Sequence, residues 1–240
     1  VWLFNNDEKM IDFFEYICLA IIQGITEFLP VSSSGHIELS KYFFNNSTIQ
    51  NTGAFTTVIL HLATALSIIF IYRKKLKSIL VINTKESRSY VLKILFSIIP
   101  VFILVVFNVD EFIENKYNNG WDLRFLSLMF LITGLILFTS EKIKPKTKSI
   151  TFATALLIGV AQAIAILPGI SRSGATISTS IILGHNKNNA AKFSFLIVIP
   201  LIIGAALNDI LNGNFSESKI DISILIFGFI SALLTGLIAC

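Results

Sequence analysis

Residues 28–36, FLPVSSSGH, break a long apolar run near the start of the chain. Proline has no backbone N–H and ends helices, whereas serine and glycine favour the first turn of a new helix. The apolar run after this break ends at residue 44, so it is too short to cross the roughly 30 Å of hydrocarbon in a membrane. The stretch predicts a re-entrant hairpin: one helix, a polar break and a short return helix.

Residues 167–175, LPGISRSGA, form a second break of the same kind, and the short apolar run after it ends at residue 184. Both breaks contain a Leu-Pro pair followed by a Ser/Gly cluster. This similarity predicts two diverged repeats, at about residues 8–140 and 150–240, within a single integral membrane domain of residues 1–240. Polar backbone is tolerated at membrane depth only where it is buried in protein or lines a wet cavity.

The composition places the whole chain in a membrane. Of its 240 residues, 54% are apolar and 14% are charged, whereas soluble domains carry about 25% charged residues. Within lipid these runs must be helices, so the sequence predicts an all-α polytopic membrane protein. The net charge of +4 is mild and its cations lie in short loops, which argues against nucleic-acid binding. The apolar runs are residues 11–31, 54–72, 91–109, 123–140, 150–168, 175–184, 193–211 and 223–240.

The charges of the loops predict how the hairpins are oriented. The segments 73–93 and 141–148 are rich in Lys and Arg, whereas 110–122 and 213–221 are acidic or neutral. The positive-inside tendency makes the basic segments cytoplasmic, and the hairpins then enter from opposite faces. Opposed hairpins are typical of inverted-topology repeats, whose site lies where the interrupted helices meet. The first repeat has one more predicted span than the second, so we expect a last span to be missing from this sequence.

Ionisable residues in membrane segments indicate function, and here they cluster at the two breaks. Glu27 and His36 flank the first break, and Arg172 lies in the second. If the breaks meet, one pocket holds a carboxylate, an imidazole, a guanidinium and several hydroxyls, which suits a phosphate ester or anhydride. Glu27 is expected to hold Mg²⁺ or Ca²⁺ or to act as a base, while Ser33, His36 or water would attack phosphorus.

Several polar residues have plainer interpretations. Serine and glycine often serve only to pack membrane helices against one another. His61 and Thr64 are expected to hydrogen-bond to a neighbouring helix, and His185, in a basic loop, is expected to be solvated. Glu38 and Lys41 are expected to form an ordinary pair on a helix surface.

Two longer strings resemble the paired signatures of one family, the undecaprenyl-diphosphate phosphatases, also called bacitracin-resistance proteins. Residues 23–36, QGITEFLPVSSSGH, resemble the first signature, and residues 167–176, LPGISRSGAT, resemble the second. Residues 193–200 are similar to the helix that follows in that family, and the resemblance covers about residues 11–240.

The resemblance implies a hydrolase acting on a phosphoric anhydride, which converts undecaprenyl pyrophosphate to undecaprenyl phosphate and inorganic phosphate. This reaction recycles the lipid carrier for peptidoglycan synthesis and confers bacitracin resistance. The family's fold implies interdigitated inverted repeats in the bacterial plasma (inner) membrane, with the active site toward the outer face. The expected partner is a polyprenyl pyrophosphate lipid, with a homodimer left open.

The family's functional positions carry over residue by residue. The implied catalytic residues are Glu27, Ser33, His36 and Arg172. The implied substrate-binding residues are Ser32, Ser34, Ser171, Ser173, Gly174 and Thr176. The implied metal ligands for Mg²⁺ or Ca²⁺ are Glu27 and Gln23.

One departure concerns Gln23, where the family often has Glu. A neutral amide can coordinate a cation through its oxygen, but it is a poor base. The rival hypothesis is a transporter or flippase for an anionic lipid or small anion, because broken helices that point at an anion are a transporter device. Glu27 and His36 beside a serine cluster favour hydrolysis, since transport needs no proton-transfer pair.

Overall fold

The computed structural model describes residues 2–44, 54–81, 84–109, 112–113, 122–144, 148–211 and 221–240, and these parts are helical. Four helices are long and apolar enough to cross a membrane, and the bent pair α4–α5 makes a fifth if it counts as one span. The prediction of an all-α polytopic membrane protein is therefore confirmed. The helices are α1 (Trp2–Thr26), α2 (Ser33–Phe44), α4 (Ala54–Ile71), α5 (Arg73–Leu80), α6 (Lys85–Val106), α8 (Leu123–Glu141), α9 (Phe152–Ile164), α10 (Arg172–Ile182), α11 (Lys187–Leu211) and α12 (Ile222–Ala239).

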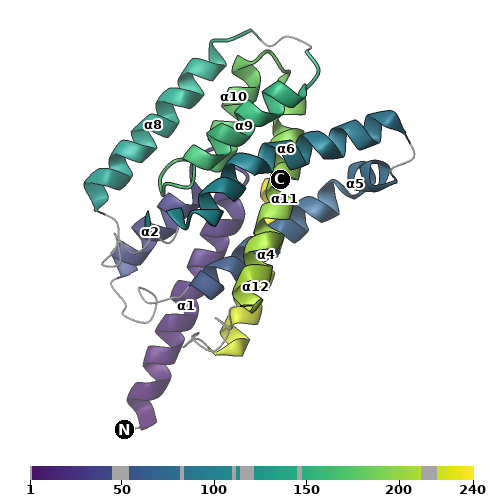
Figure 1. Ribbon diagram of the computed structural model, residues 1–240. Coiled ribbons are helices and arrows are strands. Elements are labelled where there is room, and N and C mark those ends of the chain that lie inside the picture. The colour runs from purple at the N-terminus through teal and green to yellow at the C-terminus, as the bar shows by residue number, and fades with distance from the viewer. Residues whose placement is uncertain are drawn as a thin grey trace.

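Both predicted hairpins are present. The first joins α1 to the 12-residue α2, and the second joins α9 to the 11-residue α10. Helices of this length extend only about 18 Å, so neither return limb crosses a membrane alone. Figure 1 shows the α1–α2 hairpin entering from the lower end of the molecule and the α9–α10 hairpin from the upper end. The two breaks consequently meet in the interior.

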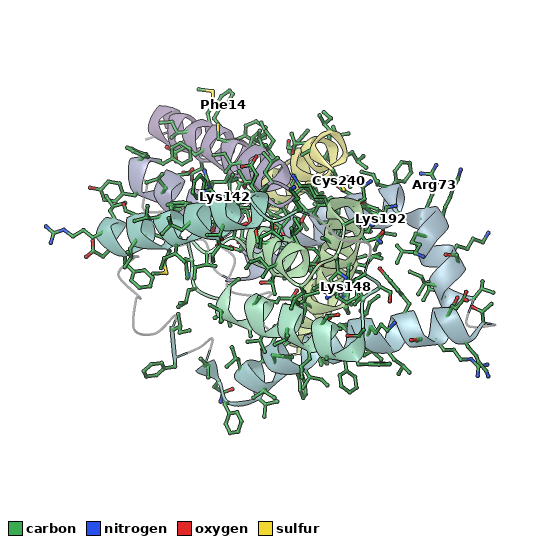
Figure 2. All side chains as sticks on the ribbon, turned by 90° about the horizontal axis from the view of Figure 1, so that it is seen from above. Phe14, Arg73, Lys142, Lys148, Lys192 and Cys240 are labelled. Atoms are coloured by element: carbon green, nitrogen blue, oxygen red, sulfur yellow. The ribbon has the colours of Figure 1, made fainter. Side chains whose placement is uncertain are left out.

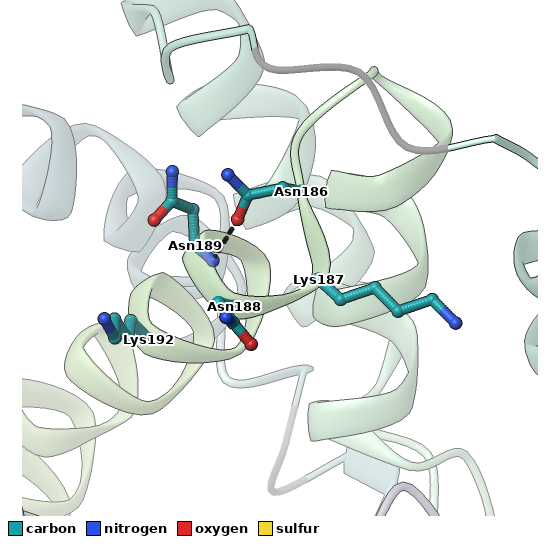
Figure 3. Close-up of a pocket in the computed structure, with 5 residues that line it drawn as sticks. All are labelled: Asn186, Lys187, Asn188, Asn189 and Lys192. Carbon is teal, nitrogen blue, oxygen red and sulfur yellow. Dashed lines mark hydrogen bonds between the residues drawn. The ribbon is translucent and has the colours of Figure 1, made fainter.

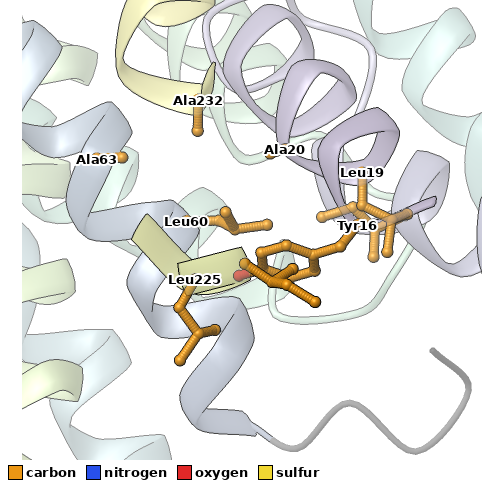
Figure 4. Packing of buried hydrophobic residues seen from close by; sticks show 9 residues of the cluster. Tyr16, Leu19, Ala20, Leu60, Ala63, Leu225 and Ala232 are labelled. Atoms are coloured by element: carbon orange, nitrogen blue, oxygen red, sulfur yellow. The ribbon is translucent and has the colours of Figure 1, made fainter. Parts of the chain in front are cut away.

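The helices of the two halves alternate in space. Helix α1 packs along α12, α9 packs along α6, and α4 packs against both α11 and α12. Figure 4 shows the core between α1, α4 and α12, where the Tyr16 ring lies among Leu19, Leu60 and Leu225. A Cβ added at Gly228 would lie 2.3 Å from Tyr16 Cε1, so this ring requires glycine on α12.

Over the middle of α6 and α8 the exposed side chains are mostly apolar, as expected for helices that face lipid. Large side chains such as Phe102 and Leu131 are exposed, whereas Gln23, Glu27 and Ser171 are buried. The polar residues thus face inward and the apolar ones outward, as in a membrane rather than in water.

The basic segment 73–93 contains a bend that the apolar pattern did not predict. Helices α4 and α5 meet at Tyr72 with an angle of 79°. Four of the eight residues of α5 are Lys or Arg and all four are exposed, whereas Ile79 is buried. This amphipathic pattern is typical of a helix that lies along a membrane interface. Figure 2, seen from above, shows Arg73 at the right of the molecule and Phe14 at the upper left, with Lys192 and Lys148 nearer the middle.

The contact between α6 and α9 generates a first prediction. A Cβ at Gly159 would lie 2.2 Å from the Ser97 carbonyl oxygen, whereas a Cβ at Gly134 on α8 meets nothing within 4 Å. Gly159→Ala is expected to cost about 1–3 kcal/mol through overpacking and to lower Tm by several degrees in detergent. Gly134→Ala is the matched control and should leave Tm unchanged or slightly higher, because alanine favours helices. Equal Tm values for the two variants would contradict this packing.

Candidate active site

The two breaks are in direct contact. Ser173 Oγ, in the first turn of α10, donates a hydrogen bond to the Leu29 carbonyl oxygen at 3.1 Å. A Cβ at Gly35 would lie 2.9 Å from Gly169 Cα, so the two backbones approach closely at this point. Helix α8 holds the second break in place, because Thr133 Oγ1 donates to the Gly169 carbonyl and accepts from the Ser171 amide.

Glu27 lies at the centre of this contact, in the turn that follows α1, and is buried. Its Oε1 accepts a hydrogen bond from Arg172 Nη2, which joins residues 145 positions apart in an ion pair. Its Oε2 accepts from Ser33 Oγ at 2.7 Å and from Gln23 Nε2 at 2.9 Å. Both carboxylate oxygens are therefore satisfied, as a buried charge requires.

Arg172 is the first residue of α10. The helix is capped by Ser171, whose Oγ accepts from the Gly174 amide at 3.0 Å. Thr176 hydrogen-bonds back to the Arg172 carbonyl and across to Ser194 on α11. The guanidinium and the N-terminal end of the α10 dipole thus point into one region, which favours an anion there.

The serines of the first break have separate positions. Ser32 has a φ of 69°, a left-handed conformation that serine rarely adopts. Its Oγ accepts from the Gly35 amide at 3.3 Å and lies 3.4 Å from Ser34 Oγ. Ser33 opens α2 and is the serine that contacts the carboxylate, an arrangement in which a base lies beside a hydroxyl nucleophile.

His36 is oriented by its own helix and by α8. Its Nδ1 lies 2.8 Å from the Ser32 carbonyl oxygen, and its ring packs edge-on against Phe130 with a centroid distance of 5.2 Å. Among the described residues, His36 is not one of the groups that contact the Glu27 carboxylate. Those groups belong to Arg172, Ser33, Gln23 and a different histidine.

That histidine is His61, on α4, which the sequence analysis assigned to helix packing. Its Nε2 lies 3.7 Å from Glu27 Oε2, and its Nδ1 lies 2.9 Å from the Thr57 carbonyl oxygen of its own helix. The signal for it was present in the sequence, because an ionisable residue in the middle of an apolar run indicates function.

Two other expectations have clear outcomes. Glu38 and Lys41 form the expected pair on α2, with a separation of 3.1 Å. The expectation that His185 is solvated is wrong: the residue is fully buried, and its Nδ1 lies 2.9 Å from the Lys148 carbonyl oxygen.

The donor set around Glu27 fits a divalent cation in part. The described portion of the chain has no cluster of three or more His, Cys, Asp and Glu side chains that could hold a metal. Gln23 Oε1 is buried, has no hydrogen-bond partner among the described residues and lies on the amide that contacts Glu27. One carboxylate and one amide oxygen suit a Mg²⁺-type ion that takes its remaining ligands from phosphates and water. The cation remains a prediction.

The cavity at the site is small. It is lined by Glu27, Arg172, Ser173 and Ser194 among others, and its volume of about 10 Å³ is about that of one water-sized sphere. A larger hollow of about 420 Å³ lies at the start of α11, lined by residues 186–189 and Lys192 (Figure 3). That hollow is lined by lysines and asparagine amides, whereas the smaller cavity is lined by Glu27, Arg172 and two serines.

The fold and the site define a polytopic membrane protein with a buried carboxylate–hydroxyl–guanidinium centre suited to phosphate chemistry. Residues 16–240 match the family model of bacitracin resistance protein BacA. The chain is 46% identical over 233 residues to a protein named undecaprenyl-diphosphatase from Christiangramia forsetii, covering 95% of this chain and 87% of that one. Relatives of the same name in Bacteroides fragilis and Thermosipho africanus are 41% and 42% identical, covering 95% and 93% of this chain and 87% of each relative. The chain belongs to the bacitracin resistance protein BacA family.

The ion pair predicts a non-additive effect on stability. Arg172→Gln leaves the buried Glu27 carboxylate without its charged partner and is expected to cost about 3 kcal/mol of unfolding free energy. The double variant Glu27→Gln with Arg172→Gln should have a higher Tm than Arg172→Gln alone, because no unpaired charge remains. Thermal unfolding of the single and double variants in detergent measures this coupling. Strictly additive shifts would contradict the pair.

Proposed function

We infer that the chain is an undecaprenyl-diphosphatase, a hydrolase that converts undecaprenyl pyrophosphate to undecaprenyl phosphate and inorganic phosphate. The observation that carries this inference is the contact of Glu27 with both Ser33 and Arg172. A hydroxyl, a carboxylate and a guanidinium in contact support attack on a phosphate, in a chain that belongs to the BacA family.

Each group has a part in the reaction. Arg172 and the amides at the start of α10 bind the non-bridging oxygens of the terminal phosphate, where negative charge must be neutralised. Glu27 accepts the proton of Ser33 as the Ser33 oxygen attacks the terminal phosphorus. The anhydride P–O bond breaks, and undecaprenyl phosphate leaves. Water then cleaves the phosphoserine ester and releases inorganic phosphate.

Cation binding belongs to the same proposal. Glu27 and Gln23 Oε1 would hold a divalent cation, which supplies charge neutralisation for the diphosphate when it is bound. Ser171, at the N-cap of α10, and Ser173 and Thr176, in its first turns, would orient the phosphate together with Ser32 and Ser34 of the first break. His36 would hold the first break in its conformation through the contact of its Nδ1 with the Ser32 carbonyl oxygen.

Substrate binding requires a rearrangement of Arg172. The cavity beside Glu27 accepts about one water-sized sphere, which is far smaller than a diphosphate. The Arg172 guanidinium, which would bind the phosphate, is already paired with Glu27 Oε1. We therefore propose that phosphate oxygens replace Glu27 as the partner of Arg172, which frees Glu27 Oε1 while Oε2 stays next to Ser33.

The surroundings extend the proposal. Hairpins from opposite ends, and the alternation of α1 with α12 and α6 with α9, support inverted-topology repeats. With the basic segments in the cytoplasm, the site of this multi-pass protein would open toward the outer face of the bacterial plasma membrane. There it would recycle the lipid carrier for cell-wall synthesis and confer bacitracin resistance. A homodimer stays a prediction.

The function predicts a large effect of Arg172→Ala. Release of phosphate from undecaprenyl pyrophosphate in detergent should fall by about 100-fold to 1000-fold in kcat/KM, because a charge-neutralising donor is lost. Arg124→Ala, on the exposed start of α8, is the matched control and should keep its activity. A folded wild-type protein that binds the lipid without releasing phosphate would instead support the transporter or flippase hypothesis.

A second prediction concerns the nucleophile. Ser33→Ala is expected to lower kcat by about 1000-fold with KM within about threefold, because the serine acts on the bound substrate rather than in binding. Ser127→Ala on the exposed side of α8 is the control. Stopped reactions of the wild type should contain an acid-stable phosphoserine. If Ser33→Ala retains its kcat, attack by water or His36 replaces this mechanism.

A further inference from the structure

We propose that His61 is a nitrogen ligand of the cation at this site and gives the site a preference for Mn²⁺ over Mg²⁺ and Ca²⁺. This inference rests on the proposed function, because it concerns the cation that would neutralise the diphosphate. It departs from the expectation for the chain, in which only Glu27 and Gln23 hold the metal.

The first observation is the orientation of the imidazole. His61 Nδ1 lies 2.9 Å from the Thr57 carbonyl oxygen, which can only accept a hydrogen bond. The proton of the neutral ring is therefore on Nδ1, and Nε2 keeps its lone pair. Imidazoles that bind metals in proteins are usually held in this way, with the second ring nitrogen donating to a carbonyl or carboxylate.

The second observation is the separation of His61 Nε2 from Glu27 Oε2. At 3.7 Å it is too long for a hydrogen bond between these atoms. Two ligand atoms that share one cation at about 2.1 Å each can be up to about 4.2 Å apart, so the observed separation allows a shared ion. Arg172 already balances the charge of Glu27 through Oε1, so the imidazole is not required as its counter-ion.

The third observation is the unsatisfied amide of Gln23. Its Oε1 is completely buried and has no hydrogen-bond partner in the described structure, which carries a free-energy cost. Its Nε2 contacts the same Glu27 oxygen that faces His61. Rotation of the amide by 180° would turn Oε1 toward that oxygen, and a cation between them would satisfy both.

The chemistry of the donor set then indicates the metal. Mg²⁺ and Ca²⁺ are hard cations that bind carboxylate, carbonyl and water oxygens. An imidazole nitrogen raises affinity for first-row transition metals relative to them. A donor set of one imidazole nitrogen with carboxylate, amide and phosphate oxygens suits Mn²⁺, the first-row transition ion that shares the preference of Mg²⁺ and Ca²⁺ for oxygen ligands.

The test is Mn²⁺ binding by the metal-free protein in detergent. Continuous-wave EPR measures the free Mn²⁺, and pulsed EPR detects a nitrogen nucleus bonded to the ion. We expect a ¹⁴N coupling in the wild type that changes to a ¹⁵N coupling when histidine alone is ¹⁵N-labelled. This labelling needs no mutation and identifies a histidine nitrogen as the ligand.

Variants assign the coupling to one histidine. His61→Gln replaces the nitrogen by an amide oxygen, so it should abolish the coupling and weaken Mn²⁺ binding by about tenfold. Competition by Mg²⁺ should become correspondingly more effective. His36→Gln is the matched control and should retain the coupling. A wild type without nitrogen coupling, or a coupling lost in His36→Gln but kept in His61→Gln, would overturn the proposal.

Phosphate release measured on the same samples separates this inference from the function. If the wild type releases phosphate but shows no nitrogen coupling, His61 is not a metal ligand and the proposed phosphatase function still stands. A nitrogen-coupled Mn²⁺ in a protein that never releases phosphate supports the cation site and contradicts the phosphatase.

Discussion

The ion pair between Glu27 and Arg172 is the interaction on which the rest of the structure depends. A charge inside a membrane protein is costly unless it is paired, and each of these residues lies where an interrupted helix brings it to the interior. The pair joins the two halves of the chain at the two breaks, between the turn that follows α1 and the first residue of α10. The hairpins, the alternation of helices around them and the glycines that allow close contact all serve to bring these two side chains together.

The same constraint explains why the breaks contain serine, glycine and proline. Amides in the first turns of α2 and α10 lack intrahelical partners, and the hydroxyls of Ser32 and Ser171 accept from two of them. The hydroxyl of Thr133 donates to the Gly169 carbonyl in the second break. These hydroxyls also make the interior polar enough to receive a phosphate. Structural support and substrate binding therefore use the same side chains, so a serine here has both a packing role and a proposed phosphate-binding role.

Much of the arrangement follows from local sequence. The two Leu-Pro-Ser/Gly breaks predict the hairpins, and the rarity of charge in apolar runs singles out Glu27 and Arg172. The 79° bend at Tyr72 could not be predicted from the lengths of the apolar runs. The basic residues that follow the run are also helical, so the sequence does not show that the helix axis changes direction there. The place of His61 beside Glu27 also required the structure, since it depends on how α4 packs against the turn after α1. No sequence motif links His61 to Glu27, so their proximity can be seen only in the packed structure.

The account's central claim is that two hairpins form one phosphate site. A structure determined with undecaprenyl methylenediphosphonate, a non-hydrolysable analogue, tests it most directly. We predict that the terminal phosphonate oxygens contact the Arg172 guanidinium and lie beside Ser33 Oγ, with Arg172 withdrawn from Glu27. A headgroup bound in the hollow lined by residues 186–189 and Lys192, with Arg172 still paired to Glu27, would contradict the claim.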